Sequence, residues 1–240
     1  MAQLAFITGG AVRIGKAIAL HLAREGFSVA IQYRNSKADA EATVAAIQAM
    51  GARGACFQAG LADHGQVEAL FPAIHKSLGR VTCLINNASH YADDRVESLT
   101  EESWDSHLSI NLKAPVFLAQ AFAAQLPAGE TGNIINILDQ RVLRPNPDFF
   151  SYTLSKSALW AATKRMAQGL APRIRVNAIG PGPALPSVYQ SPEEFEHESR
   201  STLLGHGTTP EEIANAVSFI LNSPAMTGQM IALDGGQHLL

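Results

Sequence analysis

A helical tyrosine and lysine, preceded in the chain by an acid, are the residues of this sequence best suited to chemistry. Tyr152 and Lys156 stand in the segment YTLSK, and Asp139 ends the earlier segment IINILD. Residues four apart share one face of a helix, so the phenol and the ammonium can converge on one point. The group so formed is a proton donor beside a cation, which suits an enzyme that must deliver protons.

The protonation state of this tyrosine depends on which neighbour dominates. A free tyrosine titrates near ~10, and lowering its pKa to ~7 requires about 4 kcal/mol. One lysine charge ~4 Å away, at an effective dielectric constant of ~20, supplies about that much. A nearby carboxylate has the opposite effect: it holds the phenol protonated, or it is itself protonated and passes on its proton. Both alternatives leave a donor that suits a reductase.

The composition indicates an ordinary globular domain. With 240 residues, 47% of them hydrophobic and 16% charged, the chain can bury one large core. The formal net charge is -3 and the 18 Lys and Arg residues are scattered, so there is no basic footprint for nucleic acid. We therefore expect a small-molecule substrate and no nucleic-acid partner.

The cysteines and the first residues bear on where the protein works. Cys56 and Cys83 both sit in apolar runs, as buried thiols do, and this indicates a reducing cytoplasm. The first residues lack a basic signal-peptide region, and no stretch reaches the ~18 apolar residues of a membrane span. We expect an unprocessed cytoplasmic chain without a membrane segment.

Short apolar runs rich in branched residues alternate with helix-like segments along the whole chain. Strands joined by helical crossovers form a parallel sheet with helices on both faces. We therefore expect one α/β domain over residues 1–240, a Rossmann-type doubly wound sheet of about seven strands. The expected strands are Leu4–Ile7, Phe27–Tyr33, Gly54–Gln58, Val81–Asn86, Asn133–Leu138, Ile174–Ile179 and Met230–Leu233.

Capping sequences mark several helix starts, and one segment is irregular. The stretches beginning at Ser36, Ser191 and Thr209 each resemble a capping box, the last two with proline at the first helical position. Residues 180–207 are rich in proline and follow the carboxyl end of a strand, where α/β proteins cover their substrates. This segment is either a substrate loop or a plain surface loop.

The first expected strand leads into a glycine-rich turn and then a helix over residues 16–25. In Gly9-Gly-Ala-Val-Arg13-Ile14-Gly15 the glycines let the backbone approach a pyrophosphate, whose charge then lies at the helix amino end. Arg13 replaces the middle glycine of the usual spacing. Its side chain could contact the pyrophosphate and also reach a ligand stacked on the nicotinamide.

The end of the second expected strand indicates which cofactor binds. NAD enzymes place an acid there for the ribose hydroxyls, but this chain has Arg34, Asn35 and Ser36. An arginine and a hydroxyl at a helix amino end suit a 2′-phosphate. The sequence therefore favours NADPH.

Five motifs in order along nearly the whole chain resemble the short-chain dehydrogenase/reductase family. Besides the glycine turn and Tyr-x-x-x-Lys, these are Asn86-Asn87-Ala88-Ser89, Asn111 in INLKAP, and the turn Pro181-Gly182. Arg13, Ser89, Asp139 where most members have serine, and the ending DGGQH resemble the subgroup of pteridine reductases and dihydromonapterin reductases. That resemblance implies reduction of a pterin ring by NADPH.

The resemblance also implies roles for individual residues. Tyr152 would be the acid, Lys156 would bind the nicotinamide ribose, and Asp139 would supply a proton to the pterin. Asn111 would hold a water that connects Lys156 to solvent. The implied cofactor-binding set is Gly9, Arg13, Ile14, Gly15, Arg34, Asn35, Ser36, Leu61, Asn87, Ala88, Ser89, Tyr152, Lys156, Pro181 and Gly182.

Substrate recognition would involve an aromatic ring. Tyr91 stands where the subgroup places a ring that sandwiches the pterin against the nicotinamide, although it could simply pack under a loop. The implied substrate-binding set is Arg13, Ser89, Tyr91, Asp139 and Tyr152. Packing or surface roles are expected for His90, His107 and His206, and we expect no metal site.

One position departs from the family. Where most members have an acid that contacts the adenine amino group, this chain has Gly60 followed by Leu61. That contact is lost, or it is taken over by Asp63 or by a backbone carbonyl. We expect weaker adenine recognition with the fold retained.

Three functions remain open from the sequence. The first is a reductase of dihydromonapterin- or dihydrobiopterin-type pterins, and the second is a carbonyl reductase acting on a ketone or 3-oxoacyl substrate. The third is a noncatalytic NADPH-binding regulator, although Tyr152, Lys156 and Asn111 argue against it because a binder needs no proton donor. By resemblance, the alanine-rich helix over residues 149–170 would join a homotetramer.

Overall fold

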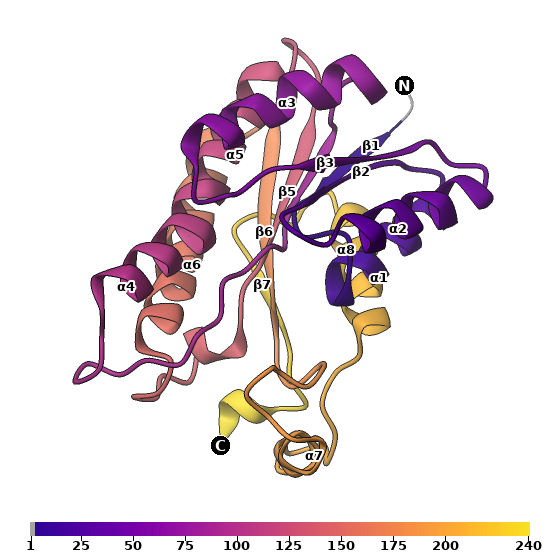
Figure 1. Ribbon diagram of the computed structural model, residues 1–240. Coiled ribbons are helices and arrows are strands. Elements are labelled where there is room, and N and C mark those ends of the chain that lie inside the picture. The colour runs from indigo at the N-terminus through magenta and orange to yellow at the C-terminus, as the bar shows by residue number, and fades with distance from the viewer. Residues whose placement is uncertain (1–2) are drawn as a thin grey trace.

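The computed structural model describes residues 3–240, so the first two residues of the expected domain lie outside it. Its centre is a single sheet of seven parallel strands in the order β3-β2-β1-β4-β5-β6-β7 (Figure 1). This confirms the expected doubly wound α/β fold. The strands are β1 (Leu4–Ile7), β2 (Ser28–Tyr33), β3 (Gly54–Gln58), β4 (Cys83–Asn86), β5 (Gly132–Ile137), β6 (Ile174–Pro181) and β7 (Met230–Leu233).

Helices cover both faces of the sheet (Figure 1). A separate hydrophobic core lies under each layer of helices. One core packs α1, α2 and α8 against the sheet, and the other packs α3, α5 and α6. None of the helices in residues 3–240 has the length and apolar character that crossing a bilayer requires. The helices are α1 (Arg13–Arg24), α2 (Lys37–Ala49), α3 (His64–Leu78), α4 (Glu101–Leu108), α5 (Ala114–Gln125), α6 (Phe150–Leu170), α7 (Pro192–Arg200) and α8 (Pro210–Leu221).

The capping predictions have a mixed outcome. Reciprocal capping boxes begin α7 at Ser191 and α8 at Thr209, as expected. The box at Ser36 is wrong, because that side chain makes no capping hydrogen bond although the residue precedes α2. The hydroxyl of Ser36 is therefore not committed to the helix end.

The strand order reverses beside β1, which lies between β2 and β4. In parallel sheets, ligands bind where the loops from two such neighbouring strands diverge at the carboxyl edge. Here the glycine turn follows β1, and the Asn87-Ala88-Ser89 loop follows β4. The fold therefore brings the two predicted cofactor loops to the same crevice.

A line of buried amides joins the centre of the sheet to α6. Asn86 Nδ2 donates to Asn136 Oδ1 at 2.8 Å, and Asn136 Nδ2 donates to Thr163 Oγ1 at 2.8 Å. Asn86 and Asn136 are at most 2% exposed, so their polar atoms depend on each other for hydrogen bonds. These hydrogen bonds fix the position of α6 against β5.

We expect Asn136→Leu to lower the free energy of unfolding by about 2–3 kcal/mol, because it removes two buried hydrogen bonds, one with Asn86 and one with Thr163. Urea denaturation of the unmodified and substituted proteins measures the change. The control is Asn215→Leu on the exposed face of α8, which should change stability little. Equal stability of the Asn136 variant and the control would contradict the expectation.

Candidate active site

The glycine turn is a tight cradle at the start of α1. Gly9 has a φ of +63°, a conformation that glycine adopts without strain. A Cβ atom on Gly15 would lie 2.2 Å from the carbonyl oxygen of Gly9, so no side chain fits there. Asn87 Nδ2 donates to the carbonyl oxygens of Thr8 and Gly9 at 2.9 and 3.2 Å, and so ties this turn to the loop after β4.

Arg13 connects the glycine turn to the irregular segment after β6. Its φ of +54° lies in the left-handed region that favours the glycine it replaces. The guanidinium Nη2 donates to the carbonyl oxygen of Pro186 at 3.0 Å and lies 3.4 Å from that of Leu185. Arg13 thus contacts the loop over residues 180–207 as well as bordering the crevice.

A cleft of about 370 Å³ runs along the crevice between β1 and β4. Arg34 borders it at the end of β2, and none of the described lining residues is acidic. Such a lining fits an anionic dinucleotide with a phosphate near Arg34. Neither Asn35 nor Ser36 lines the cleft, although both adjoin Arg34 in the chain. The lining residues are Gly9, Val12, Arg13, Ile14, Gly15, Gln32, Arg34, Leu61, Asn87, Ala88, Ser89, His90 and Ile110.

Local hydrogen bonds hold the chain at Gly60, the position where the sequence departs from the family pattern. The Gly60 N–H donates to Gln66 Oε1 at 2.7 Å, and Asp63 accepts from the Gln66 backbone and side chain while capping α3. Asp63 does not line the cleft, whereas Leu61 does. Of the alternatives for the adenine contact, a role for Asp63 is therefore not supported.

The acid, the tyrosine and the lysine meet at the carboxyl ends of β5 and β6. The Tyr152 hydroxyl donates to Asp139 Oδ2 at 2.8 Å, and the Arg141 N–H donates to Asp139 Oδ1 at 2.9 Å. Lys156 Nζ donates to the carbonyl oxygen of Ile137 at 2.8 Å. Tyr152 and Lys156 are 6% and 2% exposed, so both polar groups act within a nearly dry site.

Burial dominates the electrostatics of all three groups. Burial raises the pKa of the Asp139 carboxyl, while the nearby Arg141 guanidinium lowers it. Burial and then the Asp139 carboxylate raise the pKa of Tyr152 well above its usual value. Burial lowers the pKa of Lys156 to about 8. Of the two effects weighed from the sequence, the one that keeps the phenol protonated prevails, because burial adds to the effect of the carboxylate.

Asn111 lies in a π-helical turn over Ser109–Lys113 that follows α4. Its side chain accepts from the His90 N–H at 2.7 Å and donates to the His90 carbonyl oxygen at 2.9 Å. It also donates to Ser155 Oγ at 3.0 Å. The amide of Asn111 therefore holds the loop after β4 against α6, a contact that the family pattern did not predict.

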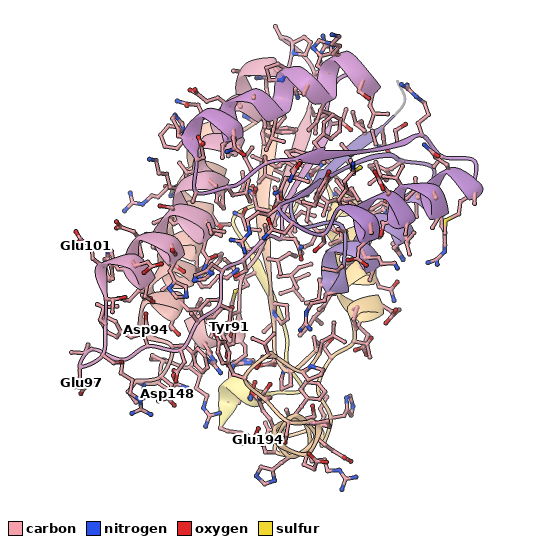
Figure 2. The ribbon with its side chains drawn as sticks, in the orientation of Figure 1. Tyr91, Asp94, Glu97, Glu101, Asp148 and Glu194 are labelled. Carbon is pink, nitrogen blue, oxygen red and sulfur yellow. The ribbon has the colours of Figure 1, made fainter. Side chains whose placement is uncertain are left out.

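Tyr91 lies on the loop after β4 (Figure 2), and its ring packs against other aromatic rings. Its ring stacks on Phe149 with centroids 4.4 Å apart, and it lies nearly perpendicular to the Tyr152 ring with centroids 4.8 Å apart. The guanidinium of Arg141 lies 4.7 Å from the centre of the Phe149 ring. Phe149, in a left-handed conformation at the start of α6, and Arg141 were both missed by the sequence analysis, since neither belongs to a motif.

A second cavity of about 460 Å³ adjoins the cleft and shares Arg13, Ser89 and His90 with it. It brings together Tyr91, Asp139, Tyr152 and Lys156 with the turn Pro181-Gly182 and the segment after it. The segment over residues 180–207 therefore borders this cavity, as a substrate loop would. Four lining residues, Ala184, Leu185, Ser187 and Val188, belong to the expected loop but were not named individually, and His90, Ile137 and Leu138 were not assigned to the cavity from the sequence.

The three histidines singled out in the sequence lie in different surroundings. His107 is fully buried, His206 is exposed, and His90 borders both cavities. Across residues 3–240, no group of three or more His, Cys, Asp and Glu side chains is arranged to hold a metal ion.

Comparison with known proteins places the chain in a family. A family model described as enoyl-(acyl carrier protein) reductase matches residues 10–238. A solved short-chain dehydrogenase/reductase from Serratia marcescens has 31% identity and a TM-score of 0.92, and covers 98% of each chain. The protein belongs to the short-chain dehydrogenase/reductase family, and it is an oxidoreductase of that family.

Two further relatives differ in the substrates that their names imply. The solved structure of alternative dihydrofolate reductase 1 from Brucella suis in complex with NADP is 46% identical, with a TM-score of 0.96. It covers 99% of this chain and 96% of its own. The 3-oxoacyl-(acyl-carrier-protein) reductase of Staphylococcus aureus is 32% identical over 100% of this chain and 99% of its own length.

The raised pKa of Asp139 has a consequence for stability. A carboxyl whose pKa is higher in the folded state stabilises the fold below its unfolded pKa, and this stability is lost as pH rises through the folded pKa. Near pH 8 we expect the Asp139→Asn variant, whose side chain cannot ionise, to have a higher free energy of unfolding than the unmodified protein. The difference should shrink near pH 4.

Chemical denaturation at the two pH values measures this difference, and Asp93→Asn on the exposed loop is the control. A variant that gains nothing near pH 8 would show that the Asp139 carboxylate is not destabilised by its surroundings.

Proposed function

We propose that this protein reduces the ring of a dihydropterin, such as 7,8-dihydromonapterin or 7,8-dihydrobiopterin, with NADPH. The observation that carries the proposal is the buried hydrogen bond between Tyr152 and Asp139 at 2.8 Å. A carboxylic acid can donate a proton to a ring nitrogen, whereas the serine that most of the family has there can only form a hydrogen bond. The 46% identity to an alternative dihydrofolate reductase supports this choice.

The cofactor is NADP(H), as the sequence predicted, and the NADP complex of the Brucella suis relative agrees with this assignment. When bound, it supplies the hydride that goes to a ring carbon of the substrate. Arg34 would hold the 2′-phosphate, and the cradle at Gly9 and Gly15 would receive the pyrophosphate. Lys156 would bind the nicotinamide ribose, since its ammonium is buried beside Tyr152.

The proton for the ring nitrogen would come from the Asp139 and Tyr152 pair. Burial raises the pKa of both groups, so each keeps its proton to a higher pH than it would in water. Tyr91, which borders the cavity beside Tyr152, would stack on the flat substrate ring. Arg13 and Ser89 border the same cavity and would contact the polar edge of the pterin.

A carbonyl reductase is the second candidate, supported by the identity to a 3-oxoacyl-(acyl-carrier-protein) reductase. In that case Asp139 would orient the substrate carbonyl, and Tyr152 would protonate the forming alkoxide. A noncatalytic NADPH-binding regulator is less well supported, because Tyr152, Asp139 and Lys156 converge on one cavity. We also propose, from the family resemblance, that the protein works as a cytoplasmic homotetramer.

The cofactor assignment predicts the effect of reversing one charge. Arg34→Asp should lower the ratio of kcat/KM with NADPH to kcat/KM with NADH by about a hundredfold, because it replaces a phosphate ligand with a group that repels phosphate. The kcat/KM for each cofactor, measured with one substrate, tests this. Equal values for both cofactors in the unmodified protein would contradict the assignment. Arg24→Asp, on α1 and outside the cleft, is the matched control.

A substitution at Asp139 distinguishes a pterin reductase from a carbonyl reductase. If Asp139 protonates a pterin nitrogen, Asp139→Ser should lower kcat for a dihydropterin by about a hundredfold or more, because serine does not readily release a proton near neutral pH. For a ketone substrate the same change should be tolerated. The assay is NADPH oxidation with 7,8-dihydromonapterin, 7,8-dihydrobiopterin and a 3-oxoacyl thioester.

Tyr152→Phe is the control, since it should abolish turnover of either substrate class while the cleft for NADPH remains. If the unmodified protein reduces the thioester and none of the pterins, the pterin proposal fails.

A further inference from the structure

A buried polar cluster lies behind the aromatic side of the cavity. It consists of Asp94, Ser103, His107 and Ser151, from the loop after β4, from α4 and from α6. Asp94, His107 and Ser151 are between 0% and 4% exposed, and these three do not line the cavity. The cluster therefore contacts the substrate only through other residues.

Asp94 caps the helix that carries the catalytic tyrosine, although it lies on a different segment. The Ser151 N–H donates to Asp94 Oδ1 at 2.9 Å, and the Phe150 N–H donates to the Asp94 carbonyl oxygen at 3.0 Å. Two of the free amides at the start of α6 are thus satisfied by one loop residue. Figure 2 shows Asp94 and Tyr91 on the same loop.

His107 joins the two segments through its two ring nitrogens. Nε2 accepts from the Ala92 N–H at 3.2 Å, so the ring proton resides on Nδ1. Nδ1 lies 2.7 Å from Ser151 Oγ and 2.8 Å from the Ser103 carbonyl oxygen. The imidazole therefore contacts the residue after Tyr91 on one side and the residue before Tyr152 on the other.

Nucleophilic catalysis does not explain this arrangement. Ser151 is fully buried, and its hydroxyl donates to Asp94 Oδ2, so its oxygen reaches neither solvent nor the cavity. Burial lowers the pKa of His107, which keeps the ring neutral and its Nε2 able to accept. The imidazole therefore holds the loop after β4 at a fixed distance from the start of α6.

We infer that His107 is a positioning residue that sets the Tyr91 ring for substrate binding. It holds the Ala92 amide at a fixed place relative to Ser151, and this fixes the backbone from which Tyr91 reaches Phe149 and Tyr152. The inference rests on the proposed function in one respect, namely that the Tyr91 ring contacts the substrate.

Two polar substitutions at His107 test the hydrogen bonds of its two ring nitrogens separately. In His107→Gln the amide reaches the place of Nε2 and can accept from the Ala92 N–H. In His107→Asn the amide replaces Nδ1 and stops short of Ala92. We expect the Asn variant to raise the substrate KM about tenfold, with kcat within about threefold, because one backbone hydrogen bond is lost. The Gln variant should keep KM within about threefold, and the Kd for NADPH should be unchanged in both.

A double-mutant cycle with Tyr91→Ala distinguishes positioning from loss of stability. If His107 acts through Tyr91, the Asn substitution should cost less than about twofold in kcat/KM once the ring is gone. The control is Ile74→Val, a buried substitution on α3 away from the cavity, which should lower the melting temperature without changing KM.

The inference is overturned if the Gln variant is as impaired as the Asn variant. It is also overturned if the Asn substitution costs the same factor with and without Tyr91. All variants are assayed with 7,8-dihydromonapterin and a 3-oxoacyl thioester. An unmodified protein that reduces only the thioester defeats the pterin proposal alone, and the same Gln and Asn comparison on the thioester then decides the role of His107.

Discussion

The hydrogen bond between Tyr152 and Asp139, made in a nearly dry site, is the interaction on which the proposed chemistry depends. A lysine alone beside the phenol would favour its ionised form, but burial and then the Asp139 carboxyl at 2.8 Å raise the pKa of Tyr152. Both groups therefore hold protons more strongly than they would in water. A site of this kind suits a reaction that takes up a proton with each hydride.

The rest of the fold holds that pair in place from several directions. The line of amides from Asn86 and Asn136 fixes α6 on the sheet, and Asp94 caps the same helix at its start. Asn111 holds the loop after β4 at His90, shortly after Asn87 and Ala88, whose amides donate to the Thr8 hydroxyl. Residues of this loop line both the cofactor cleft and the proposed substrate cavity, so the position of its backbone affects the shape of both.

Much of this architecture was predictable from sequence because it follows from regular periods. Residues four apart on a helix placed Tyr152 beside Lys156, and alternating strands and helices placed Asp139 at the same sheet edge. Contacts across long distances were not predictable. The bonds of His107 to Ala92 and Ser151, the reach of Arg13 to Pro186, and the stacking of Phe149 on Tyr91 depend on loop paths that no local pattern encodes. Ser36 shows the converse, since a capping pattern there did not produce a cap.

The crystal structure of the protein with NADP and a dihydropterin tests the central claim most directly. The account predicts that the pterin ring lies against Tyr91 in the substrate cavity, with a ring nitrogen within hydrogen-bonding distance of Asp139 or Tyr152. A pterin bound away from Asp139, or one that leaves the Tyr152 and Asp139 pair without contact to any ring nitrogen, would contradict it.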